Sequence, residues 1–197
     1  FTGGLLNIEN KRTATLYRRG EEDLPVFYLW TLLSDKIHPH GPHFANDSEP
    51  VKIHFPSKKT FRSYSLRSAT QGKSIIIRHR FLGSINVTYT VTVKNDSPFV
   101  SWRITVANHH KDLRWGQVVG VGFPQLAGIV LGEAPEKAVL VRPNRFGEKI
   151  PDPIGSAGTF PVNLCYEGMA SMMWMDLYSV GNNSGLYFAS YDKTLLM

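Results

Sequence analysis

Aromatic side chains with polar neighbours are the residues of this sequence whose types and spacing best suit a chemical task. Sugars bind by stacking their C–H faces on aromatic rings, while Asp, Asn and Arg side chains hydrogen-bond to the hydroxyl groups. Core packing is the competing interpretation of such aromatics. Candidate positions near expected loops are Trp115 and the segments 142–146, 174–178 and 191–192. From these we predict a carbohydrate surface formed by Trp174, Asp176, Tyr178, Arg145 and Asp192.

Other constellations that could carry chemistry are weaker. His38, His40 and His43 have the side chains of a metal site, but the two prolines between them favour an extended polar loop. Ser156 lies between Gly155 and Ala157-Gly158, without the strand–turn–helix setting of a nucleophile elbow. The carboxylates of the C-terminal half show no spacing that selects a glycosidase pair. We therefore expect no catalytic residue, metal ion or cofactor in this segment.

Composition and charge restrict the class of protein and its partners. The 197 residues are 42% hydrophobic and 19% charged, as in a globular domain. The net charge of +6 is spread over scattered basic pairs, which we interpret as solvated charge rather than a nucleic-acid site. The single cysteine, Cys165, excludes an internal disulfide and is interpreted as a buried small residue. No 18-residue apolar span or signal-peptide pattern occurs, so we expect no membrane partner; secretion or a periplasmic location stays open.

An antiparallel hairpin is the element that the sequence predicts most clearly. Residues 87–93 alternate apolar with polar side chains, and the same alternation resumes over residues 100–106. The break between them, Asn95-Asp96-Ser97-Pro98, contains residues that favour turns. One face of this hairpin should be buried, with Trp102 as a core residue, and the apolar residues 75–77 should add a third strand.

Further short strands are predicted on both sides of this hairpin. They cover residues 5–10, 13–17, 27–33, 51–55, 61–66, 118–123, 138–141, 171–177 and 186–190, the last two forming a second hairpin. Proline and glycine predict two long loops, residues 34–50 and 142–161. Many short strands with few or no helices indicate an all-β, antiparallel β-sandwich, with residues 1–197 as one domain.

The resemblance to a known family rests on three stretches. Residues 91–108 resemble the paired long strands of the galactose-mutarotase-like β-supersandwich. Residues 167–178 with 185–192 resemble the end of the N-terminal supersandwich domain of glycoside-hydrolase-like proteins, and residues 2–10 are similar to the start of such domains. The resemblance implies a longer chain in which a catalytic (β/α)₈ barrel follows. Motifs with the catalytic His and Glu of the mutarotases are not found.

Three functions are compatible with these observations. The first is a non-catalytic carbohydrate-binding or scaffold domain of a glycoside hydrolase, which packs against the barrel and lends loops to a sugar site. The second is a stand-alone carbohydrate-active enzyme of the aldose-epimerase type. The third is a basic β-sandwich interaction module. We expect the first, with carbohydrate and the barrel of the same protein as partners.

Overall fold

A computed structural model describes residues 5–10, 15–32, 51–109, 117–124, 137–143, 147–153, 174–181 and 184–191, together with residues 129, 131 and 155. These residues form strands that pair antiparallel, and they contain no α-helix. The chain divides into two compact units, which comprise residues 1–6 with 20–127 and residues 7–19 with 128–197. The predicted all-β, antiparallel class is confirmed.

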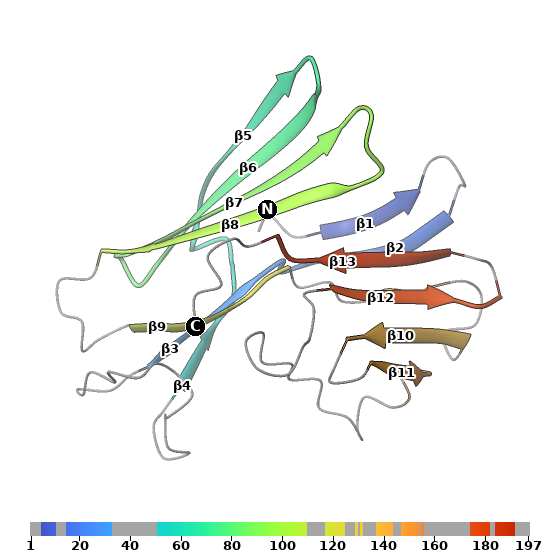
Figure 1. Ribbon diagram of the computed structural model, residues 1–197. Helices are drawn as coiled ribbons and strands as arrows, with labels where there is room; N and C mark the ends of the chain where they lie inside the picture. Colours follow the sequence, from blue (N-terminus) through green and yellow to red (C-terminus); the bar gives the residue numbers. More distant parts are fainter. Residues whose placement is uncertain are drawn as a thin grey trace. The chain divides into compact units, whose positions relative to one another are not determined.

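Two sheets make up most of the first unit (Figure 1). The larger sheet has the order β5-β6-β7-β8 and the smaller has the order β4-β3-β9. Their strands are β3 (Tyr28–Leu32), β4 (Val51–His54), β5 (Phe61–Ala69), β6 (Gly72–Phe81), β7 (Ile85–Lys94), β8 (Val100–Asn108) and β9 (Gln117–Gly122).

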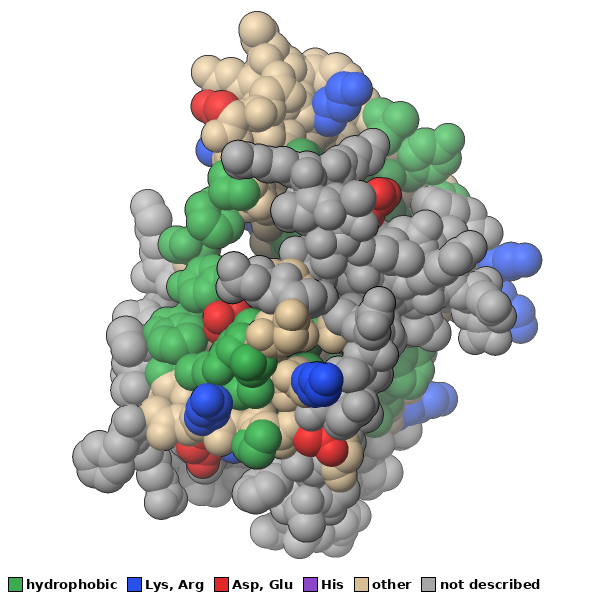
Figure 2. Space-filling view, turned by 90° about the vertical axis from the view of Figure 1, so that its right-hand side faces the viewer, with side chains coloured by type: hydrophobic (Ala, Val, Ile, Leu, Met, Phe, Trp, Pro, Cys, Tyr) green, Lys and Arg blue, Asp and Glu red, His purple; other side chains and the backbone are tan. Residues whose placement is uncertain are grey.

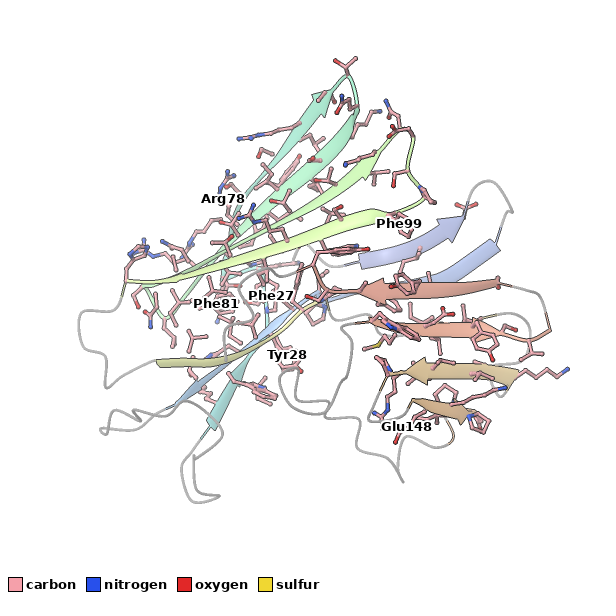
Figure 3. The ribbon with its side chains drawn as sticks, viewed as in Figure 1. Phe27, Tyr28, Arg78, Phe81, Phe99 and Glu148 are labelled. Carbon is pink, nitrogen blue, oxygen red and sulfur yellow. The ribbon has the colours of Figure 1, made fainter. Side chains whose placement is uncertain are left out.

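The core of this unit lies between the two sheets. Leu29 lies in β3 of the smaller sheet and Phe27 immediately precedes that strand, and both are fully buried. They pack in one cluster with side chains of β6 and β7, which are Ile77, Phe81, Ile85, Val87 and Tyr89. Figure 3 shows Phe27 and Phe81 on the same side of the larger sheet. Two sheets that share one core in this way form a β-sandwich.

The predicted central hairpin is present as β7 and β8, and residues 75–77 lie in the third strand, β6. The alternation of apolar and polar side chains along β7 buries Val87 and Tyr89 on one face, as predicted. Trp102 is half-buried on that face and packs edge-on against Phe123, with ring centroids 6.1 Å apart. Burial decreases toward the turn, where Val93 is 50% exposed. The apolar pattern therefore continues beyond the part of the strand that the sandwich core covers.

The second unit contains a four-stranded sheet with the order β11-β10-β12-β13. Its strands are β10 (Ala138–Arg142), β11 (Glu148–Pro151), β12 (Trp174–Ser179) and β13 (Ser184–Ala189). β12 and β13 are the predicted second hairpin. A further two-stranded sheet pairs β1 (Leu5–Asn10) with β2 (Thr15–Leu24), where strands over residues 5–10 and 13–17 were predicted.

The predicted loop over residues 142–161 is wrong in part, because β11 lies within it. β11 pairs with β10 from Arg142↔Glu148 to Val139↔Pro151, and the Arg142 Nε donates to Glu148 Oε2 at 2.5 Å. Gly147 provides the left-handed backbone, with φ of 95°, immediately before β11. Pro151 is tolerated because it ends an edge strand, where one side of the backbone needs no partner. Proline and glycine content therefore overstated the length of this loop.

Several predictions lie outside the described residues: the loop over residues 34–50 with its three histidines, Cys165 and Trp115. The part of the chain that the structure describes includes no helix of the length and apolarity needed to cross a membrane.

Candidate functional site

The candidate site is one face of the β11-β10-β12-β13 sheet in the second unit. This face carries Trp174, Asp176 and Tyr178. These three residues alternate along β12, so their side chains leave the sheet on the same side. Directly across on β13, Asp176 faces Tyr187 and Tyr178 faces Gly185. On the other neighbour, β10, Asp176 faces Val141. The structure thus brings together three of the five predicted residues and adds Tyr187, which the sequence prediction missed. We call Trp174, Asp176, Tyr178 and Tyr187 the β12–β13 face.

Two rings of this face form a stacked pair. Trp174 and Tyr187 have centroids 6.1 Å apart and planes inclined by only 24°. Trp174 is half-buried, whereas Tyr187 is 51% exposed. Nearly parallel rings that remain open to solvent offer the flat apolar surface on which a sugar ring can stack. The pair therefore has the geometry of a stacking platform rather than of a closed core contact.

A hollow of about 470 Å³ adjoins the pair. It is lined by Asp176, Tyr178, Ser179, Ser184, Gly185 and Tyr187. In this lining the Asp176 carboxylate and the Tyr178 and Tyr187 phenol groups lie on the β12–β13 face, where they supply hydrogen-bond acceptors and donors. Ser179 and Ser184, which pair with each other, alternate to the other side of the sheet. An apolar platform beside several polar groups is the composition that small polar ligands require.

Asp176 is the acidic group of the hollow. Its side chain is half-buried, and this burial raises the pKa of the carboxyl group above its usual value. Partial removal from water also strengthens each hydrogen bond that the ionised carboxylate accepts. Asp176 is thus suited to orient a ligand by its hydroxyl groups.

Gly185 shapes the floor of the hollow. A side chain there would bring a Cβ atom to 2.9 Å from the Cβ of Tyr178 and to 3.0 Å from the carbonyl oxygen of Leu177. Real Cβ atoms do not approach backbone so closely without a shift of the strands. Glycine at this position therefore allows β12 and β13 to keep their spacing beside Tyr178.

Two predicted site residues, Arg145 and Asp192, lie outside the described residues. Arg142, from the same arginine-containing segment as Arg145, is only 7% exposed and pairs with Glu148 across β10 and β11. It therefore holds two strands together.

Tyr187 could have been found from the sequence only by fixing the register of the second hairpin, because cross-strand pairing places it opposite Asp176.

A second half-exposed aromatic group lies in the first unit. Tyr28 and Trp30 have centroids 5.6 Å apart, and Phe55 packs 6.0 Å from Tyr28. Gly122 and Gly120 lie directly across from Tyr28 and Trp30, and the two rings occupy the space that side chains there would fill. This group lies on the outer face of the smaller sheet, where the described neighbours are apolar.

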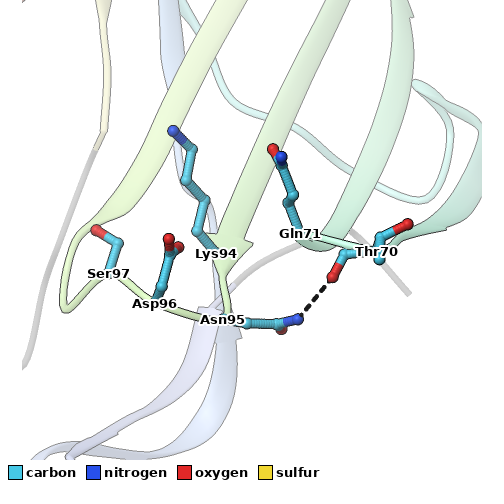
Figure 4. Close-up of a pocket in the computed structure, with 6 residues that line it drawn as sticks. All are labelled: Thr70, Gln71, Lys94, Asn95, Asp96 and Ser97. Atoms are coloured by element: carbon cyan, nitrogen blue, oxygen red, sulfur yellow. Dashed lines mark hydrogen bonds between the residues drawn. The ribbon is translucent and has the colours of Figure 1, made fainter.

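Another hollow, of about 480 Å³, lies where the turns of the larger sheet meet (Figure 4). Its lining is Thr70, Gln71, Lys94, Asn95, Asp96 and Ser97. The Asn95 side-chain amide donates to the Thr70 carbonyl oxygen at 3.0 Å, and the Asn95 backbone N–H donates to the Gln71 carbonyl oxygen at 3.0 Å. These bonds join the two turns. The hollow has no aromatic surface and is the weaker candidate for a sugar site.

Two histidines lie in or beside the core of the first unit. His79 is 2% exposed, its Nδ1 lies 3.2 Å from Thr60 Oγ1, and its Nε2 has no hydrogen-bond partner among the described residues. Burial lowers the pKa of His79 to about 4. The Nε2 of His54 lies 2.8 Å from Thr31 Oγ1, and burial, with Lys52 nearby, lowers the pKa of His54. Both rings are therefore neutral at pH 7, and aromatic neighbours surround His79.

Among the described residues, no group of His, Cys, Asp and Glu side chains could hold a metal ion. The surface in Figure 2 carries hydrophobic side chains with basic and acidic side chains interspersed among them.

Comparison of the chain with protein-family models, curated proteins and solved structures found no match.

Proposed function

We propose that this protein binds carbohydrate through the β12–β13 face, as a non-catalytic β-sandwich domain of a glycoside hydrolase. The observation that carries the proposal is the half-exposed Trp174–Tyr187 stack beside the half-buried carboxylate of Asp176. The rings would take the apolar face of a sugar, and Asp176 would accept hydrogen bonds from adjacent hydroxyl groups.

A binding role fits this face better than hydrolysis. Glycoside hydrolysis requires two carboxyl groups that flank the scissile bond. Among the described residues lining the hollow, Asp176 is the single carboxylate. The proposal therefore assigns catalysis to a barrel domain of the same protein, as the resemblance implies.

Isothermal titration with a panel of mono- and oligosaccharides tests the proposal. At least one sugar should bind in the micromolar to millimolar range, and the Asp176→Asn variant should bind it more weakly, by about threefold to fivefold. Asp96→Asn, an equal change at an exposed turn of the first unit, is the matched control and should leave the affinity unchanged.

The pH dependence gives a second readout of Asp176. Because burial raises its pKa, sugar affinity should be full above that pKa and decrease as the pH falls through it. The Asp176→Asn variant should lack this decrease. If every sugar fails to bind to the wild-type protein, the domain is a scaffold and the proposed function is wrong.

A further inference from the structure

The outer face of the larger sheet in the first unit carries an excess of positive charge. Residues that point away from the sandwich core alternate with the core residues along β5 to β8. Five of these outer residues are basic: Arg67, Arg78, Arg80, Lys94 and Arg103. Figure 3 shows Arg78 on the side of the sheet opposite Phe27 and Phe81. We call these five residues the basic face.

Acidic side chains do not balance this charge on the strands. All residues of β5 to β8 are described, and none of them is Asp or Glu. The nearest acidic residue along the chain is Asp96, in the turn after β7. Arg67, Arg78 and Arg103 form no ion pair with a described residue. Four strands with seven Lys and Arg residues, five of them on the basic face, and no Asp or Glu therefore attract negatively charged partners.

The remaining outer positions are mostly hydroxyl residues, which are Ser63, Ser65, Ser74, Thr88, Thr90, Thr92, Ser101 and Thr105. The hydroxyl groups of Ser74 and Thr92 hydrogen-bond to each other across β6 and β7 at 2.9 Å. Ile76 lies on the same outer face and is only 8% exposed. The basic face thus presents guanidinium groups above a floor of hydroxyl groups.

The arginines are spread along the sheet rather than gathered at one point. Thr90 of β7 pairs with Arg103 of β8 on one side and with Ile76 of β6 on the other. Arg78 is the next residue after Ile76 along β6 whose side chain points to the same face. Strand spacing and rise per residue place the Cα atoms of Arg78 and Arg103 about 12 Å apart. Arg80 is held at one end, where its Nε donates to the Gly83 carbonyl oxygen at 2.6 Å. Cations at such intervals match repeated anionic groups along a chain better than one compact anion.

The side chains of the basic face indicate which kind of linear polyanion suits it. Proteins that bind single-stranded nucleic acid combine cations with aromatic rings on which the bases stack. No outer residue of β5 to β8 is a Phe, Tyr or Trp, because those in these strands all lie on the core side: Phe61, Tyr64, Phe81, Tyr89 and Trp102. Carboxylate and sulfate groups on a sugar chain need only guanidinium forks and hydroxyl partners.

We infer that the basic face binds an acidic polysaccharide, one that carries carboxylate or sulfate groups along its length. The choice of a polysaccharide over other polyanions rests on the proposed carbohydrate function, whereas the site itself uses none of the residues of the β12–β13 face. Arginine–anion pairs would position the chain, and the serine and threonine hydroxyl groups would bond to its sugar hydroxyls.

Binding to immobilised dextran sulfate, polygalacturonate, uncharged dextran and single-stranded poly(dT) tests the inference, at low salt and at about 0.2 M salt. The variant Arg67→Gln/Arg103→Gln is compared with Lys59→Gln/Lys73→Gln, which removes the same charge from exposed residues outside the basic face. We expect at least one acidic polysaccharide to bind, with affinity that falls as salt rises. The arginine variant should bind about tenfold more weakly, and the lysine variant within about twofold of wild type.

Three results would overturn the inference: no binding of either acidic polysaccharide at low salt, equal weakening by both variants, or tighter binding of poly(dT) than of the polysaccharides. The Trp174→Ala variant separates the two proposals. It should lose affinity for the neutral sugars of the panel while keeping full affinity for the acidic polysaccharide.

Discussion

Two half-exposed aromatic groups, one in each unit, differ in what surrounds them. Tyr28 and Trp30 are inclined to each other by 39° and lie beside the apolar Phe55. Trp174 and Tyr187 are inclined by only 24° and lie beside Asp176 and the hollow. Partial exposure of the rings to solvent is therefore common to both groups and does not distinguish them. The Asp176 carboxylate distinguishes a face that can recognise a sugar from one whose described neighbours are apolar.

The origin of this difference lies in the cross-strand partners. Trp30 faces Gly120, and Tyr28 faces Gly122, so these rings lie against backbone. In the second unit, the partner of Tyr187 is Asp176, which places a charged group in the row beside the stacked rings. Strand register thus decides whether an aromatic residue receives a polar neighbour.

The largest loss of stability is expected on truncating a fully buried aromatic residue. Such a residue serves as a reference for the two half-exposed aromatic groups. Phe27→Ala should lower the free energy of unfolding by about 3–5 kcal/mol, because the ring packs edge-on against His79, Phe81 and Tyr89. Phe55→Ala, at a side chain that is 49% exposed, should cost less than about 1 kcal/mol. Urea denaturation measures both, and equal losses would contradict the assignment of the core.

Acid should destabilise the first unit through His79. Its pKa is about 4 in the folded protein and about 6.5 when unfolded, so the fold favours the neutral ring. The stabilisation is complete above pH 6.5, decreases as the pH falls because the unfolded chain takes up the proton, and is lost below pH 4. The loss should reach at most about 3 kcal/mol.

Unfolding free energies measured between pH 7 and pH 4 check this effect. The His79→Phe variant keeps an aromatic ring at the position but cannot be protonated, so its stability should vary less with pH. An unchanged pH dependence in this variant would assign the acid sensitivity to other groups.

Local patterning explains which parts of the fold the sequence predicts. Strict alternation identified β7 and β8, since a sheet with one buried face requires it. Residues 75–77 were recognised as a strand, but its full extent, Gly72–Phe81, was not. Ile76 interrupts the alternation because it is buried on the outer face. β11 was missed because glycine and proline flank this four-residue segment, whereas its pairing with β10 is a contact that local composition does not encode.

The candidate site was predictable only in part. Trp174, Asp176 and Tyr178 were recognised because they combine aromatic and polar groups within one short strand. Tyr187 and Gly185 belong to the site through cross-strand register, which composition does not encode. The basic face shows the same limitation. Its arginines are scattered in the sequence and were interpreted as ordinary solvated charge, and only the pairing of four strands brings them to one surface.

The most direct test of the central claim compares the two tryptophans. The sugar that binds most tightly to the wild-type protein is titrated into Trp174→Ala and, as the matched control, Trp30→Ala, whose ring is 37% exposed in the wild type. Loss of one stacking contact of about 1 kcal/mol should weaken binding by Trp174→Ala about fivefold. Trp30→Ala should bind as tightly as the wild type. Equal affinities for both variants, or greater weakening by Trp30→Ala, would contradict a sugar site on the β12–β13 face.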